Sequence, residues 1–232
     1  MNESLQPVFT DYAGSRDVAA QRNRVLRNTY WLLALSMVPT VLGAWMGVST
    51  GIVRAMTPGV SMIVFLGGAF GLMFAIEKTK NSAAGVAVLL GFTFFMGLML
   101  SRLIGAVLGL GNGAQLIMMA FAGTGLIFLG MATMSTVIKR DLSSMGKWLF
   151  IGCIMLIVAG IANFFIQSSA LMITLSVLAI GIFSAFIVHD LKRVQDGEET
   201  NYITATLGVY LSLYNVFQSL LALLGIFGGS RD

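Results

Sequence analysis

The chain has 232 residues, of which 57% are apolar and 10% are charged, and its net charge at pH 7 is +4. An ordinary soluble domain carries about 25% charged residues, so this composition excludes a soluble globular protein. The basic residues lie in short segments between long apolar runs, where they orient a membrane protein. The positive charge therefore predicts no nucleic-acid partner.

Residues 1–28 are polar, carry four arginines and contain no apolar stretch. We therefore expect no cleavable signal peptide, and the first apolar segment acts as its own signal. We interpret residues 1–28 as a polar cytoplasmic N-terminal tail, whose simplest role is that of a solvated tether.

Seven segments without acidic or basic side chains follow the tail, and each approaches or exceeds the roughly 20 residues that cross a bilayer. They span residues 29–53, 58–76, 82–101, 115–138, 148–166, 170–188 and 203–227. They predict an all-α membrane protein with a seven-helix transmembrane domain at 29–227 and a short external C-terminal tail at 228–232. Little chain remains for another domain, so function has to lie in the bundle or its loops.

The basic residues between the segments are unequally divided, with 11 Lys and Arg on the side of the N-terminus and 3 on the other side. The positive-inside rule places the N-terminus in the cytoplasm. The apolar pattern of the third segment continues beyond Arg102 to Leu110, which puts Arg102 in or near the outer leaflet. An arginine at a helix end usually snorkels to the interface, and the alternative is an ion path.

Small residues recur at the spacing that lets helices pack closely in lipid, as at Gly43, Gly47 and Gly51 in the first segment. This spacing predicts a compact bundle. The single cysteine, Cys153, lies inside an apolar run, so we interpret it as a small core residue without a disulfide partner in the chain.

The sixth segment ends in His189 and Asp190, and Asp190 is the best candidate for pH sensing. An acid at the cytoplasmic end of a spanning helix can titrate, pair with a base and so gate a cavity. The simpler alternative is an interfacial charge paired with Arg193, three residues further along the helix.

The seventh segment carries polar and small residues at helical spacing, so it is expected to avoid lipid and to lie centrally in the bundle. These residues either bond to other helices or line a narrow aqueous path. The same two alternatives apply to Asn163 in the fifth segment. The stripe comprises Thr204, Gly208, Tyr210, Ser212, Tyr214, Asn215, Gln218 and Ser219.

The sequence lacks the constellations that membrane enzymes need. Its one histidine lies at a helix end, no acid lies inside an apolar segment, and no phosphate-binding glycine loop is present. We predict that the protein is not an enzyme and has no cofactor. Whether it binds a metal is left open.

Several motifs, in order along the chain, resemble the Bax inhibitor-1 family, with the last apolar segment as its hallmark. They are 139–143 (KRDLS), 160–164 (GIANF), Asp190-Leu191 and 209–221 (VYLSLYNVFQSLL). The segments 197–202 (GEETNY) and 230–232 (SRD) are most similar to the YccA-type branch, which are bacterial inner-membrane proteins. The resemblance covers nearly the whole chain from Arg27.

The resemblance implies a seven-helix fold with a central last helix and, in some members, a pH-sensitive calcium leak. Two aspartates near the cytoplasmic mouth gate that leak, and Asp190 matches the first of them. Ser212 stands at the second position, which disfavours the two-acid mechanism. In a reduced version, Asp190 is expected to pair with Lys78 or Lys80, or to share a proton with Glu77.

The YccA-type branch implies a second function, that of substrate and modulator of a membrane-anchored ATP-dependent quality-control protease. The N-terminal tail, if extended, is long enough to give such a protease a place to start. Two hypotheses therefore stand side by side. One is a pH-sensitive calcium or cation leak gated by Asp190, and the other is a non-conducting protease modulator.

Overall fold

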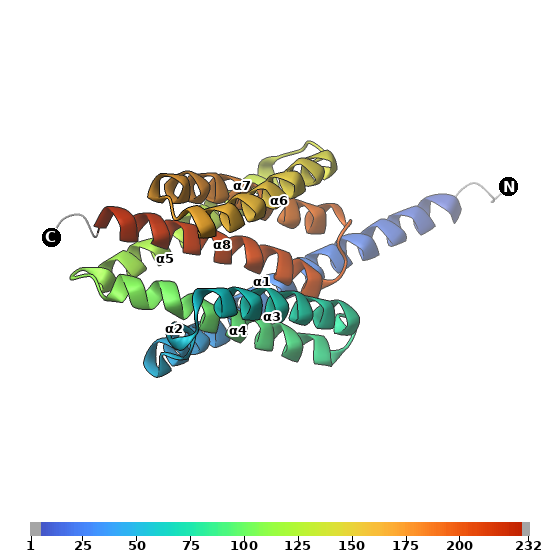
Figure 1. The fold of residues 1–232 in the computed structure, drawn as a ribbon. Coiled ribbons are helices and arrows are strands. Elements are labelled where there is room, and N and C mark those ends of the chain that lie inside the picture. Colours follow the sequence, from blue (N-terminus) through green and yellow to red (C-terminus); the bar gives the residue numbers. More distant parts are fainter. Residues whose placement is uncertain (1–5, 229–232) are drawn as a thin grey trace.

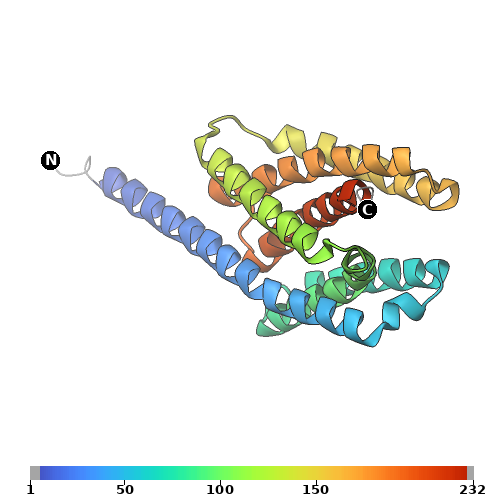
Figure 2. The same cartoon turned by 90° about the vertical axis from the view of Figure 1, so that its left-hand side faces the viewer.

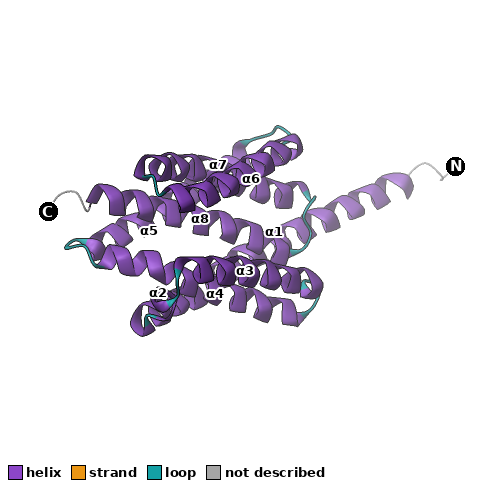
Figure 3. Cartoon of the chain, viewed as in Figure 1, coloured by secondary structure: helices purple, strands orange, loops and turns teal. Residues whose placement is uncertain are grey.

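The computed structural model describes residues 6–228, with side chains described for 19–142 and 144–228. All regular structure in this part of the chain is helical (Figure 3). The helices are α1 (Gln6–Thr50), α2 (Ile52–Ala55), α3 (Pro58–Thr79), α4 (Ala83–Leu108), α5 (Gly113–Val137), α6 (Ser143–Ile166), α7 (Ser169–Asp196) and α8 (Tyr202–Gly228).

Seven of these helices are long and apolar enough to cross a membrane, which confirms the predicted fold class. The short α2 lies in the connection between α1 and α3, after Gly51, whose φ of 66° is one that glycine adopts without strain. The helix over the third segment is longer than predicted, because α4 continues through Arg102 to Leu108.

The bundle has two ends. At the Asp190 end, α3, α5 and α7 finish and α4, α6 and α8 begin. At the Pro58 end, α3, α5 and α7 begin and α4, α6 and α8 finish. The long α1 starts beyond the Asp190 end and projects away from the other helices (Figures 1 and 2).

The N-terminal tail is helical over residues 6–28, so a protease would have to unwind it before the tail reached the extended state considered above. This stretch contains three alanines and four arginines, which favour helix, and it continues into the first span without a break. Contact with the bundle is made by Arg22, whose Nη1 donates to the carbonyl of Gln195 at 3.0 Å, and by Val25, which packs on Val194 and Ala205. Residues 1–5 and most of the predicted C-terminal tail, 229–232, lie outside the described part.

Helix α8 lies at the centre of the bundle, as predicted, and packs against α1, α3, α4, α5 and α7 (Figure 1). Helix α6 lies at the periphery and packs on α7. The largest buried cluster joins α4 and α8 to their neighbours through side chains such as Leu89, Phe92 and Tyr210.

Glycines bring α1 and α4 into close backbone contact. A Cβ atom at Gly97 would lie 2.0 Å from the carbonyl oxygen of Thr40, and one at Gly43 would lie 2.1 Å from that of Phe94. Both distances are far inside van der Waals contact, so only glycine fits at these crossings. The packing role predicted for the glycines of the first span therefore holds for Gly43.

Candidate functional site

Asp190 lies on α7, half-buried against α8. Its Oδ1 is 3.1 Å from Nδ1 of His189, and a Cβ at Gly208 would lie 2.8 Å from its Oδ2. The missing side chain at position 208 therefore makes room for the carboxylate. His189 is itself buried and packs against Gly146 of α6, where a Cβ would lie 2.5 Å from Nε2.

The sequence did not lead us to pair His189 with Asp190. Neighbouring residues on a helix normally point in different directions, so adjacency alone gave no reason to join them. The only sequence signal for this pair was that the single histidine of the chain, His189, directly precedes Asp190.

The other partners predicted for Asp190 are engaged elsewhere. Arg193 pairs with Glu198 at 3.6 Å, because Gly197, with a φ of 83°, turns the chain after α7 and brings Glu198 back towards the helix. The expected pairing of Asp190 with Arg193 is therefore wrong.

The charges at the end of α3 also keep to their own helix. Lys80 bonds to Glu77, and Nζ of Lys78 lies 5.0 Å from the ring centre of Phe74. Glu77 is exposed, with 61% of its side-chain surface accessible. The pairings expected between Asp190 and Lys78, Lys80 or Glu77 are thus corrected by the structure, which gives these groups local partners instead.

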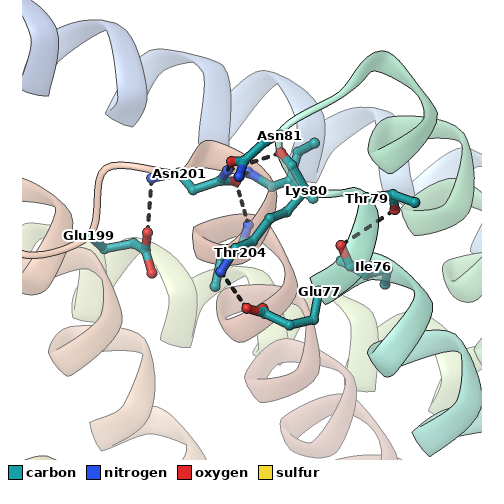
Figure 4. A network of polar contacts seen from close by, with 9 residues as sticks. Ile76, Glu77, Thr79, Lys80, Asn81, Glu199, Asn201 and Thr204 are labelled. Atoms are coloured by element: carbon teal, nitrogen blue, oxygen red, sulfur yellow. Dashed lines mark hydrogen bonds and ion pairs between the residues drawn. The ribbon is translucent and has the colours of Figure 1, made fainter.

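Asn201 joins the start of α8 to the connection between α3 and α4 (Figure 4). Its Oδ1 accepts from the backbone N–H groups of Ile203 at 2.9 Å and Thr204 at 3.2 Å, which caps the helix. Its Nδ2 donates to the carbonyl of Lys80 and to Oδ1 of Asn81, both at 2.9 Å. One side chain therefore both starts α8 and fixes its position.

Two tyrosines of the α8 stripe bond to neighbouring helices. The hydroxyl of Tyr210 lies 2.9 Å from Oγ1 of Thr40 and donates to the carbonyl of Thr93 at 3.3 Å. The hydroxyl of Tyr214 donates to the carbonyl of Met96, also at 3.3 Å. Ser212, on the same helix, is buried with 3% of its surface accessible.

Other members of the stripe line an open cavity of about 790 Å³ in the half of the bundle nearer the Pro58 end. Asn215, Gln218 and Ser219 of α8 lie on it, as does Asn163 of α6. Asn215 is also bonded to its own helix, its Nδ2 donating to the carbonyl of Leu211 at 2.8 Å. Arg102 is the one charged residue that lines this cavity.

The described residues contain no group of three or more His, Cys, Asp or Glu side chains that could hold a metal ion. The arrangement near Asp190 is instead a single acid beside a single imidazole. It can exchange a proton and change local charge. Along α8, the buried Tyr210 lies between this pair and the cavity, and Tyr214 itself lines the cavity.

The fold and the sites define a polytopic seven-helix membrane protein whose last helix forms the core. The family model described as "Inhibitor of apoptosis-promoting Bax1" matches residues 22–229. The chain therefore belongs to the Bax inhibitor-1 family, as its motifs indicated.

Curated relatives match along almost their whole length. The chain is 37% identical to the "Modulator of FtsH protease YccA" of Escherichia coli K12, over 90% of this chain and 92% of that protein. It is 36% identical to an uncharacterized membrane protein of Vibrio cholerae, over 95% and 96%. An uncharacterized protein of Pseudomonas aeruginosa is also 36% identical, over 99% of both chains. A further relative is named as an inner membrane protein, and the chain is a multi-pass protein of that membrane.

Proposed function

We propose that this protein modulates a membrane-anchored ATP-dependent protease of the FtsH type and acts as a non-enzymatic partner of it. The observation that carries the proposal is the 37% identity, over nearly the full length, to the relative named as a modulator of FtsH. The absence of acids from the apolar segments and the lone imidazole at the bundle end support a role through contact and not through catalysis.

The projecting start of α1 supports contact with a protease (Figure 2). Bundle contacts are made at Arg22 and Val25, so the residues before them leave the packed part of the protein. The predicted topology places this segment on the cytoplasmic side. An isolated helix of about 15 residues is only marginally stable in water, so an ATP-driven enzyme can unwind a projecting helix of this length at little cost.

Deletion of residues 2–20 tests this proposal because it removes the projection and keeps Arg22 and Val25. We expect a longer half-life in cells that contain the protease and weaker co-purification with it. Deletion of 229–232 at the other end of the chain is the matched control and should change neither. An unchanged half-life and unchanged co-purification after deletion of 2–20 would count against the proposal.

A pH-sensitive calcium or cation leak gated by Asp190 stays a prediction. The cavity argues against it as a cation path, since its one charged lining residue is the cation Arg102. Calcium and proton flux into liposomes, at mildly acidic and neutral pH, tests it directly. A flux whose pH dependence disappears in Asp190→Asn supports the leak. A flux equal to that of empty liposomes contradicts the leak and leaves protease modulation as the proposed function.

A further inference from the structure

The cavity near the Pro58 end is bounded by two pairs of helices and floored by a fifth. Helices α3 and α4 pack together on one side, α6 and α7 pack together on the other, and α8 lies between them (Figure 1). The cavity is open, and at about 790 Å³ it has room for part of a large ligand.

Charge is distributed very unevenly over this cavity. Arg102 is exposed, lines the cavity, and has no hydrogen-bond or ion-pair partner in the part of the chain that the structure describes. No acid is among the lining residues. An unpaired guanidinium in such surroundings attracts an anion, and its fixed fork of donors suits phosphate oxygens.

The depth of Arg102 matches that of lipid phosphates. Helix α4 has 26 residues, about 39 Å at 1.5 Å per residue, against about 30 Å for the hydrocarbon core of a bilayer. Arg102 lies about 9 Å before the end of α4, so its Cα lies about 4.5 Å inside the hydrocarbon boundary when α4 is centred. An arginine side chain spans that distance to the phosphates.

The rest of the lining suits an amphiphile. The floor presents the amides and hydroxyl of Asn215, Gln218 and Ser219, which can bond to a glycerol or ester group. The walls present large apolar side chains, among them Phe65 of α3 and Phe183 of α7, which suit an acyl chain. A free inorganic anion would leave this apolar surface uncovered.

We propose that this cavity binds an anionic phospholipid of the surrounding bilayer, with its phosphate on Arg102 and an acyl chain between α3 and α7. The site goes beyond the modulator function and does not depend on it. It makes the protein a receptor for one class of lipid at the end of the bundle opposite Asp190.

Lipid retention by the unlabelled protein tests the proposal. The protein is reconstituted in nanodiscs of phosphatidylcholine with a minor share of phosphatidylglycerol and then transferred to mild detergent. Native mass spectrometry identifies the lipids that stay bound to it. We expect retained phosphatidylglycerol enriched several-fold over its share in the nanodisc. Arg102→Gln should lose the enrichment and Arg102→Lys should keep part of it.

The matched control is Arg54→Gln, because Arg54 is exposed near the same end but does not line the cavity. It should retain lipid like the native protein, and equal loss in this variant would overturn the site. Loss of enrichment on adding inorganic phosphate would show a free-anion site and would also overturn the proposal. Melting temperature reports folding, which Arg102→Gln should leave unchanged since Arg102 has no described partner.

Cys153 locates the retained lipid, since it lines the cavity and is the one cysteine of the chain. Phosphatidylglycerol with a nitroxide on its acyl chain should quench a small fluorophore on Cys153. Phosphatidylcholine with the same nitroxide should quench it several-fold less. Arg102→Gln should remove the difference. Equal quenching by the two lipids in the native protein would place any retained lipid elsewhere and refute the site.

Discussion

Replacing Asn201 tests whether one side chain both starts α8 and fixes it to the α3–α4 connection. Asn201→Ala removes the cap on Ile203 and Thr204, which is worth about 1 kcal/mol. It also removes two bonds from Nδ2 to Lys80 and Asn81, each worth about 0.5 to 1.5 kcal/mol, with the exposed Asn81 at the low end. We expect a loss of about 2 kcal/mol in the free energy of unfolding.

Asn201→Asp separates the two contributions. Aspartate keeps the accepting oxygen of the cap and loses both donors, so it should cost about half as much as alanine. The assay is reversible unfolding in mixed micelles, with helix content followed by circular dichroism. A change of less than about 0.5 kcal/mol in Asn201→Ala would refute the reasoning, because changes of that size are typical of surface substitutions without a structural role. Equal losses of unfolding free energy in the two variants would show that the cap does not contribute to stability.

Three further changes test the packing and the Asp190 site. Gly97→Ala places a Cβ 2.0 Å from the backbone oxygen of Thr40 and should lower the free energy of unfolding by about 1 to 3 kcal/mol. Gly91→Ala on the same helix is the control, because its Cβ meets open space. Equal melting temperatures of the two variants would contradict the α1–α4 packing. Tyr210→Phe removes the hydroxyl contacts to α1 and α4 and should cost about 0.6 to 1.7 kcal/mol in micelle unfolding, and no loss would show them to be unimportant. Gly208→Ala crowds the Asp190 carboxylate and should shift the single imidazole signal of His189 in nitrogen NMR; an unshifted signal would show that this pair does not depend on the glycine.

The membrane fold follows from the sequence because charge and length decide it locally. Seven stretches without charges leave few alternatives to seven spanning helices, and the polar stripe indicated that the last helix is central. The ends were less accurate, because residues such as Lys78, Arg102 and Lys192 belong to helices that continue past the apolar core. Charge marks where a helix leaves hydrocarbon and not where it ends.

The side-chain pairings of the site were much less predictable. Arg193 is separated from Glu198 by a turn whose geometry depends on Gly197, and no periodic pattern contains that information. The cavity is formed between two separate parts of the sequence, α3–α4 and α6–α8, so Arg102 stood out in the sequence only as a charge at an unusual depth. Polar residues of α8 were recognised as a stripe, but only the packing shows which bond to neighbours and which face the cavity.

The continuity of α1 determines how the protein responds to mechanical force. One helix runs from the projecting segment to Thr50 and lies against α4, where Gly43 and Gly97 interlock the two backbones. A pull on its N-terminal end acts along the axis of this contact, so it loads the glycine crossings together in shear and does not peel them apart turn by turn. A pull from the N-terminus therefore acts first on the contacts of Arg22 and Val25 with α7 and α8, and then on the glycine crossings with α4, where most of the resistance is concentrated.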